Sequence, residues 1–327
     1  MKRNRPLVLW KEEALLRRTM HRTELASSVA MRQSGHRGEQ ELDYHLSFLP
    51  SGFKAFQDLR LLGEGGVFQM DTLIVSPYFA IIIEVKNWSG KLVYNQERGQ
   101  WIRFDVSGKE ERFPNPLGQV QRQKHHLLKW LRPHLPQPLP IETLVTLSNP
   151  NCIMDTNSPH LPNVLHTENI ISKIKELNSC HRKQILTEAQ LHTISQHLHQ
   201  NRLTDRRNPL STFHIGKEDI LPGVFCPLCQ KLHMKWNRRR FRCPFCGHSS
   251  ANAYLYALYD YFLLFGENVT CKEAQKFLKL DNRHTTYKLL QQTGFRKEGT
   301  NKGTKYYQPD NLVDRLEEQY RRQRKRG

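Results

Sequence analysis

The chain has 327 residues, of which 38% are hydrophobic and 25% are charged, so we expect a soluble globular protein of about two domains. Its longest apolar stretch, residues 254–265, contains Asp260 and is shorter than the ~18 residues that a membrane helix needs. The apolar run at residues 7–10 is too short for the core of a signal peptide. We therefore expect a cytoplasmic protein with no membrane partner.

Basic residues are concentrated in the last third of the chain. Lysine and arginine number 50 against 31 acidic residues, which gives a formal net charge of +19. Residues 216–327 contain 22 basic and 11 acidic residues, whereas residues 31–150 contain 14 and 12. This distribution predicts a polyanionic partner that binds mainly to the C-terminal third. A solvated basic tail at residues 321–326 is the alternative explanation for part of the excess.

The first fifty residues have a helical pattern. Apolar residues between positions 8 and 32 predict an N-terminal helix, which we assign to a segment 1–30. We expect Gly35 and Gly38 to precede a second helix, which begins near Glu39 and ends at Pro50-Ser51-Gly52.

Strands and helices alternate over the next segment, which we assign to one domain, residues 31–200. Strands are predicted at 53–62, 67–75, 80–86, 91–94, 100–105, 141–147 and 164–166. Helices are predicted at 116–131, 168–177 and 188–200, the first of them beginning at Pro116. This order predicts an α/β domain with a mixed sheet.

The rest of the chain predicts smaller modules. Residues 201–224 contain Asn208-Pro209 and Pro222-Gly223, which is typical of a linker. A cysteine module follows at 225–250. Predicted helices at 253–265, from Thr270 and at 282–293, followed by two short strands, favour a winged helix-turn-helix over 251–310. Residues 311–327 are expected to form a basic tail.

Two acidic residues are predicted to face each other in a hairpin. If residues 76–79 form its loop, Val75 lies opposite Ala80 and Asp71 lies opposite Glu84. Like charges in such a pair destabilise a sheet, and a divalent cation bound by both carboxylates would offset this cost. A simple ion pair of Lys86 with either acid is the alternative.

Four motifs in this order resemble the NERD (nuclease-related) domain, a branch of the PD-(D/E)XK nuclease superfamily. They are Gly35-x-x-Gly38-Glu39, Gln69-Met70-Asp71, the segment from Ile83 to Gly90, and Asn115-Pro116-x-x-Gln119. The resemblance covers roughly residues 31–150. It implies an α/β, restriction-endonuclease-like fold, in which helices flank a mixed sheet, and a metal-dependent nuclease activity.

The resemblance also implies roles for individual residues. Asp71, Glu84 and the backbone carbonyl of Val85 would hold Mg²⁺ or Mn²⁺. Lys86 would orient the attacking water and stabilise transition-state charge, while Glu39 would bind the metal or its water shell. Gln119 would line the site. Related nucleases often carry an aromatic residue or a histidine four positions after that glutamine, whereas this chain has Gln123.

The seven cysteines include two Cys-x-x-Cys pairs, and an odd count without a signal peptide argues against a disulfide framework. The spacing of the pairs suits one tetrahedral Zn²⁺, and the module resembles a zinc ribbon. A site filled by four thiolates has no open position, so the zinc would be structural. The four ligands would be Cys226, Cys229, Cys243 and Cys246.

Basic and aromatic side chains between the two cysteine pairs favour contact with nucleic acid, because they suit phosphate binding and base stacking. A solvated ribbon edge, and a packing or dimerisation role for the winged-helix segment, are the alternatives. By their spacing, Tyr287 and Leu290 are expected in the core of that segment. The candidate nucleic-acid-binding residues are Lys235, Trp236, Arg238, Arg239 and Arg240 in the ribbon, and Arg283, Lys288, Lys302 and Lys305 in the winged-helix segment.

These patterns favour a nuclease, with DNA as the favoured substrate, whose C-terminal modules capture nucleic acid. A binding protein that uses the same fold without catalysis, and a transcription regulator, are the alternatives. Oligomeric state stays open, a homo-oligomer included, as does the choice between DNA and RNA.

Overall fold

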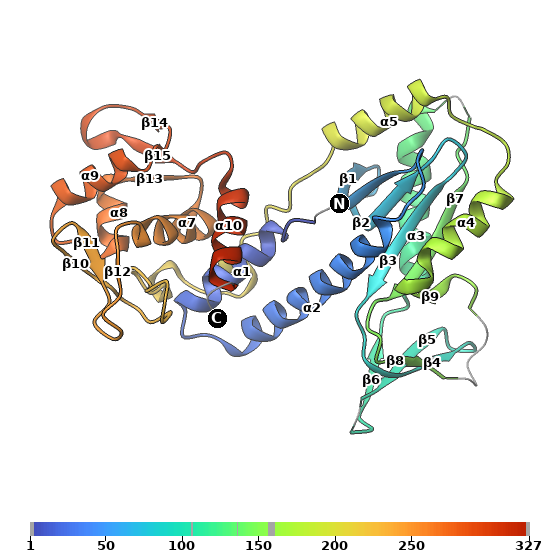
Figure 1. Ribbon diagram of the computed structural model, residues 1–327, viewed down its shortest axis with the longest axis horizontal. Coiled ribbons are helices and arrows are strands. Elements are labelled where there is room, and N and C mark those ends of the chain that lie inside the picture. Colours follow the sequence, from blue (N-terminus) through green and yellow to red (C-terminus); the bar gives the residue numbers. More distant parts are fainter. Residues whose placement is uncertain (1–2, 106, 136, 156–160, 325–327) are drawn as a thin grey trace. The chain divides into compact units, whose positions relative to one another are not determined.

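The computed structural model describes residues 3–105, 107–135, 137–155 and 161–324, and the chain forms two compact units (Figure 1). Unit 1 comprises Met1–Arg3 and Arg32–Asp205, whereas unit 2 comprises Asn4–Met31 and Arg206–Gly327. Each unit therefore combines an N-terminal segment with residues from much later in the chain. No helix among the described residues is long and apolar enough to cross a membrane.

A five-stranded mixed sheet forms the centre of unit 1, in the order β1-β2-β3-β7-β9. The first three strands are antiparallel, whereas β7 runs parallel to β3 and β9 runs parallel to β7. This mixed sheet confirms the predicted α/β class. The strands are β1 (Lys54–Gly63), β2 (Gly66–Val75), β3 (Ala80–Lys86), β7 (Ile141–Leu147) and β9 (Val164–His166).

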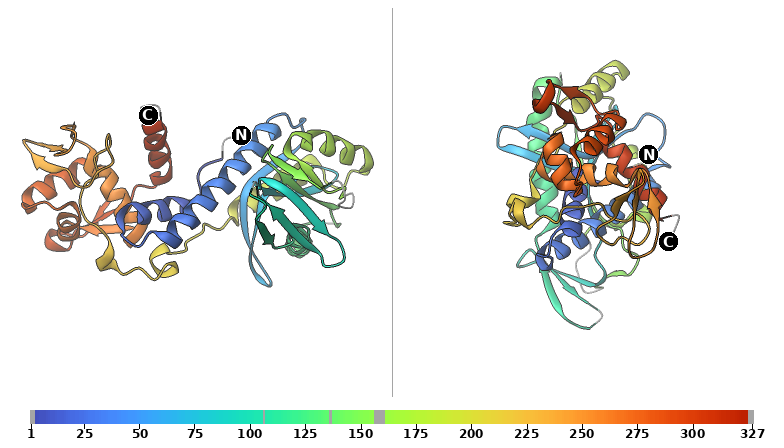
Figure 2. Two further views of the ribbon diagram at one scale, coloured as in Figure 1. Left: turned by 90° about the horizontal axis from the view of Figure 1, so that it is seen from below. Right: turned by 90° about the vertical axis from the view of Figure 1, so that its left-hand side faces the viewer.

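Helices cover both faces of this sheet (Figures 1 and 2). On one face, α3 (Pro116–Leu131) and α5 (Glu188–Gln200) pack against side chains such as Ile82 of β3. On the other, α2 (Thr23–Leu46) and α4 (Ile170–Cys180) pack against its neighbours, Ile81 and Ile83. Strand β3 is thus buried on both sides, so polar groups at its end need specific partners.

A second sheet of unit 1 has the order β6-β5-β4-β8. Its buried Trp101 donates a hydrogen bond from Nε1 to Asn115 Oδ1 (3.2 Å), and the same oxygen accepts the Leu117 N–H (3.0 Å) and caps α3. The charged strand β6 and the three-residue β8 give little sequence signal and were not predicted. The strands are β4 (Gly90–Asn95), β5 (Gln100–Phe104), β6 (Glu110–Phe113) and β8 (Cys152–Met154).

The predicted helix boundary at Gly35 and Gly38 was wrong, because both glycines lie inside the continuous helix α2. A glycine within a helix costs about 1 kcal/mol relative to alanine. At Gly38 the reason is close packing: a Cβ atom there would lie 2.4 Å from Ser148 Oγ and 2.9 Å from Asn87 Cβ. The glycine lets α2 approach the ends of β3 and β7, next to Glu39.

Unit 2 contains two small antiparallel sheets, β10-β11-β12 and β13-β15-β14. Its helices are α1 (Leu7–Arg18), α6 (Pro209–Thr212), α7 (Ala253–Phe265), α8 (Cys271–Leu278), α9 (Arg283–Gln292) and α10 (Leu312–Arg324). Its strands are β10 (Lys235–Asn237), β11 (Arg240–Arg242), β12 (Ser249–Ser250), β13 (Asn268–Thr270), β14 (Lys297–Glu298) and β15 (Lys305–Tyr307). The described residues also form 3₁₀ turns: η1 (Arg132–His134), η2 (Thr167–Asn169), η3 (Lys217–Asp219) and η4 (Asn301–Gly303).

Helix α1 belongs to the core of unit 2, where Leu9 and Leu15 are fully buried. Its two terminal arginines pair with Asp260 of α7: Arg17 contacts Oδ1, and Arg18 Nε lies 2.7 Å from Oδ2. The Arg18 side chain is fully buried and also donates to the Leu221 and Gly223 carbonyls. These partners replace part of the water that the buried guanidinium has lost, while its Nη2 has no hydrogen-bond partner among the described residues.

Two segments differ from the expected linker and tail. The residues 206–224 are part of unit 2, and Leu210, Ile220 and Val224 lie in its core. Residues 312–324 form α10, which buries Leu312 and Leu316. Apolar side chains spaced along these polar stretches are buried because several elements of unit 2 close over them. The end of the predicted tail, 325–327, lies outside the described residues.

Candidate functional site

The strand register brings Asp71 and Glu84 to one end of the central sheet. Val75 pairs with Ala80, as predicted, and the ladder between β2 and β3 ends at Thr72 and Ile83. Beyond it, Asp71 Oδ2 accepts the backbone N–H of Val85 (3.0 Å). The Asp71 carboxylate thus accepts a hydrogen bond from the backbone of β3 just beyond the end of the β2–β3 pairing.

Glu84 is almost fully buried and lies between two side chains. Lys86 Nζ is 2.7 Å from Glu84 Oε1, and Gln123 Nε2 donates to Glu84 Oε2 (3.0 Å). Lys86 also donates to Gln119 Oε1 (3.2 Å). Positions 119 and 123 are one turn apart on α3, so both glutamines face the end of β3. The alternative Glu84–Lys86 ion pair is therefore present, and Gln123 occupies the site as a partner of Glu84.

Glu39 reaches the same region from α2 through Arg3. Arg3 Nη1 donates both to Glu39 Oε2 (3.1 Å) and to the Asp71 backbone carbonyl (3.0 Å). The Arg3 side chain is only 2% exposed, and its other nitrogens contact Asp43 and Thr72. Glu39 is therefore linked to β2 through a guanidinium group.

A break in strand β1 exposes the Asp71 backbone. Asp58 would lie opposite Asp71, between the pairs Gln57–Thr72 and Leu59–Met70, but it has a left-handed φ of 48° and is not paired. Burial, followed by the charge of Glu39, raises the pKa of Asp58, while neighbouring arginines act against this shift. Asp58 is thus another acidic residue close to the site.

The acidic side chains repel one another. Burial, then the charges of Glu84 and Glu39, raises the pKa of Asp71 well above its usual range, against the opposing effects of the Val85 N–H and Lys86. Asp71, Glu84 and Glu39 offer carboxylate oxygens, which suit a hard divalent cation, but their ligand atoms do not lie as close together as those of a preformed metal cluster. The residues fit a magnesium or manganese ion in charge and in donor type.

Residues 34–148 match the sequence model of the family described as "Nuclease-related domain". The chain carries a nuclease-related domain. Its mixed sheet with flanking helices is a restriction-endonuclease-like fold, as the resemblance implied. No curated protein matches the chain.

In the nuclease-related domain, four of the predicted catalytic residues are joined by direct hydrogen bonds: Asp71, through the Val85 N–H, and Glu84, Lys86 and Gln119. The fifth, Glu39, is connected to Asp71 through Arg3. Sequence reasoning missed Arg3, Asp43 and Asp58. Asp43 has a local signal, because it lies one helical turn after Glu39 on the same face of α2. Arg3 has no local sequence signal, because its contacts with Glu39 and Asp71 form only in the tertiary fold. The carbonyl of Val85 stays a prediction as a metal ligand.

The four predicted zinc ligands form one cluster in unit 2. Cys226 Sγ lies 3.6 Å from Cys246 Sγ, Cys229 Sγ lies 3.5 Å from Cys243 Sγ, and all four sulfurs lie within 4.8 Å of one another. Elsewhere in the described ranges, no other group of three or more cysteine, histidine or carboxylate side chains gathers its ligand atoms so closely. The cluster could hold a metal ion, and four thiol donors suit zinc.

The basic candidate residues lie on the surface of unit 2. Arg238 and Arg239, both with positive φ, form the two-residue tip of the β10–β11 hairpin. Trp236 is half-buried and packs edge-on against Phe241 at a ring separation of 4.9 Å. The candidates with exposed side chains are Lys235, Arg238, Arg239, Arg240, Arg283, Lys288 and Lys305. The Lys302 side chain lies outside what the structure describes.

The expectation that Tyr287 lies in the core was wrong, whereas Leu290 is buried as predicted. Tyr287 is 49% exposed and lines a cavity of about 310 Å³ with Arg283 and His284 of α9 and Asn301 of η4. Helix α9 rests on the rest of unit 2 through Leu289 and Leu290, and this orientation turns Tyr287 outward.

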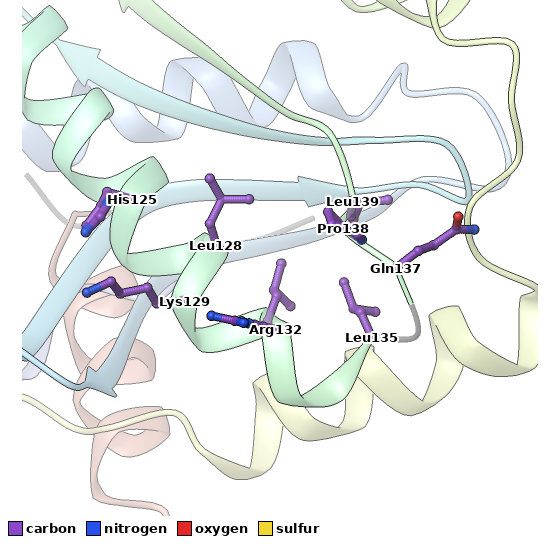
Figure 3. A pocket seen from close by; sticks show the side chains of 9 residues that line it. His125, Leu128, Lys129, Arg132, Leu135, Gln137, Pro138 and Leu139 are labelled. Atoms are coloured by element: carbon purple, nitrogen blue, oxygen red, sulfur yellow. The ribbon is translucent and has the colours of Figure 1, made fainter.

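A larger hollow in unit 1 lies between the second half of α3 and the segment before β7 (Figure 3). It has a volume of about 530 Å³, and leucines such as Leu128 and Leu135 line it beside the cations Lys129 and Arg132. The lining residues that the structure describes include no carboxylate, so this hollow is not the candidate metal site.

We predict that Asp71→Asn stabilises the metal-free protein at neutral pH, with a melting temperature a few degrees higher. The amide removes repulsion with Glu84 and Glu39 and can still accept the Val85 N–H. Because the folded-state pKa of Asp71 is raised, wild-type stability falls as pH rises through that pKa, so the gain should vanish in acid. Calorimetry in EDTA across a pH series measures this. The exposed Glu97→Gln is the control, and a lower melting temperature at neutral pH would contradict the prediction.

We predict close to one zinc per chain, measured by elemental analysis of protein purified without chelator. Cys243→Ser should lose the zinc and unfold the segment around residues 225–250, because structural zinc provides folding free energy directly. Cys180→Ser, at an exposed cysteine of unit 1, should keep it. Wild-type protein that contains no zinc would refute the assignment.

Proposed function

We propose that this protein is a metal-dependent nuclease that hydrolyses phosphodiester bonds, with DNA as its favoured substrate. The observation that carries the proposal is the convergence of Asp71, Glu84, Lys86 and Gln119 at one end of the central sheet, within a nuclease-related domain. Glu39 and Lys86 have side chains that are 21% and 20% exposed, so a phosphate could approach both.

Each side chain has a chemical role in this proposal. Asp71 and Glu84, with the carbonyl of Val85, would hold Mg²⁺ or Mn²⁺, which when bound supplies an activated water and neutralises phosphate charge. Lys86 would orient the attacking water and stabilise the charge that develops on the phosphate. Gln119 positions the Lys86 ammonium, Gln123 orients the Glu84 carboxylate, and Glu39 would hold water near Asp71.

The surface of unit 2 would capture the substrate. Arg238, Arg239 and Arg240 lie at or beside the tip of a hairpin next to the cysteine cluster, an arrangement typical of a zinc ribbon. Helices α8 and α9 with the β13-β15-β14 sheet have the element order of a winged helix, in which α9 presents Arg283 and Lys288 to solvent. The +11 charge of residues 216–327 supports phosphate binding.

We predict that Glu84→Ala and Lys86→Ala each reduce cleavage by about 100-fold or more, because each removes a group that the proposed reaction needs. Labelled single- and double-stranded DNA and RNA, with Mg²⁺, Mn²⁺ or EDTA, provide the assay. Binding measured by anisotropy in EDTA should be unchanged. Lys91→Ala, at an exposed lysine on β4, is the matched control. Wild-type protein that cuts none of these substrates would favour the non-catalytic binding protein instead.

We predict that the triple variant Arg238→Ala, Arg239→Ala, Arg240→Ala binds duplex DNA with a weaker salt dependence. The magnitude of the slope of log affinity against log salt should decrease by about 2 to 3, because three phosphate contacts are removed. The full-length chain is needed, because ending the chain at residue 205 would remove most of unit 2 and leave the apolar side of α1 uncovered. The control removes three exposed cations of unit 1, Lys175, Arg182 and Lys183, and should change the slope little. An equal decrease of the salt slope in both variants would show that duplex DNA binds to the overall positive charge of the protein and not to a defined surface of unit 2.

A further inference from the structure

Arg3 lies among the acidic side chains of the candidate site, although it is far outside the matched residues 34–148. All five N–H groups of its guanidinium have an acceptor. Nε and Nη2 donate to the two oxygens of Asp43 (3.0 and 3.2 Å), and Nη2 also donates to Thr72 Oγ1 (2.9 Å). Nη1 donates to Glu39 and to the Asp71 carbonyl. A guanidinium has five donors in a fixed plane, so this set of contacts is complete.

These contacts join two elements of the site. Glu39 and Asp43 belong to α2, whereas Asp71 and Thr72 belong to β2. The single atom Nη1 contacts both a predicted metal-shell residue and the backbone of a predicted ligand, so it fixes their separation. The bidentate Asp43 contact in turn sets the plane of the guanidinium.

We propose that Arg3 is a positioning residue of the nuclease site, which holds Glu39 against strand β2 beside Asp71. The proposal rests on the proposed nuclease function. It means that the nuclease-related domain as matched is incomplete, because the N-terminal segment provides the cation that orders its carboxylates. Residues behind metal ligands commonly change metal affinity or activity by 10- to 100-fold when they are replaced.

Lysine is a poor substitute at this position. Its ammonium has three donors and no fixed plane, so it can retain the charge but cannot reproduce five contacts. Arg3→Lys therefore separates geometry from charge, while Arg3→Ala removes both. Asp43→Asn keeps the volume of Asp43 but weakens the contact that orients Arg3.

Arg5 provides a matched control in unit 2. Its guanidinium is also buried, stacks on Trp10 and Tyr320 at 4.8 and 4.2 Å, and pairs with Glu13. Arg5→Ala should therefore lower stability without changing the metal site, which separates a general loss of packing from a specific effect at the carboxylates.

The experiment measures Mn²⁺ binding to the full-length chain by calorimetry without nucleic acid, together with single-turnover cleavage. We expect Arg3→Ala and Arg3→Lys to lower Mn²⁺ affinity by about tenfold and the cleavage rate by 10- to 100-fold, with substrate affinity in EDTA unchanged. Asp43→Asn should act in the same direction, and Arg5→Ala should bind Mn²⁺ as the wild type does. Millimolar guanidinium should restore cleavage to Arg3→Ala, whereas sodium chloride at equal ionic strength should not.

Folded Arg3→Ala and Arg3→Lys variants that bind Mn²⁺ and cleave like the wild type would overturn the proposal. If Arg3→Ala fails to fold, Arg3→Lys decides the outcome by the same measurements. A wild-type chain that binds Mn²⁺ but cuts no substrate would refute the nuclease function alone, and the Mn²⁺ affinities would still test Arg3. A wild type that binds no Mn²⁺ would overturn both.

Discussion

The crowding of carboxylates at one end of a buried sheet is the constraint around which unit 1 is built. Asp71, Glu84 and Glu39 approach closely enough that burial and mutual repulsion raise the pKa of Asp71. Such an arrangement costs free energy, and it persists because Lys86, Gln123 and Arg3 supply donors at defined oxygens. Proteins commonly accept this kind of cost at functional sites rather than in structural cores.

The surrounding fold serves to hold these groups in place. Helix α3 begins at an asparagine cap and Pro116, which fixes where Gln119 and Gln123 meet the end of β3. Helix α2 approaches the sheet at Gly38, where a larger residue would collide with Ser148 and Asn87. Backbone pairing between β2 and β3 ends at the site itself, so side chains satisfy the Asp71 carbonyl and the Val85 N–H.

Unit 2 is stabilised in a different way. Its core joins α1, from the N-terminus, to α7 through apolar contacts and through Asp260, whose carboxylate pairs with Arg17 and Arg18. The cysteine cluster lies at the end of a hairpin that leaves its arginines in solvent. In unit 2, therefore, apolar residues form the core while the cations stay exposed, which is the arrangement that suits contact with a polyanion.

The sequence by itself determined those features that depend on short spacing. The hairpin register, the helix start at Pro116 and the four-cysteine cluster all follow from residues that are close in the chain, because turns, caps and knuckles are local. Only the tertiary structure decided that Gly38 lies within a helix, that Tyr287 faces solvent and that residues 206–224 belong to a core. It also decided that Arg3 reaches Glu39 and Asp71, since a contact across more than sixty residues leaves no periodic pattern and depends on how the chain closes.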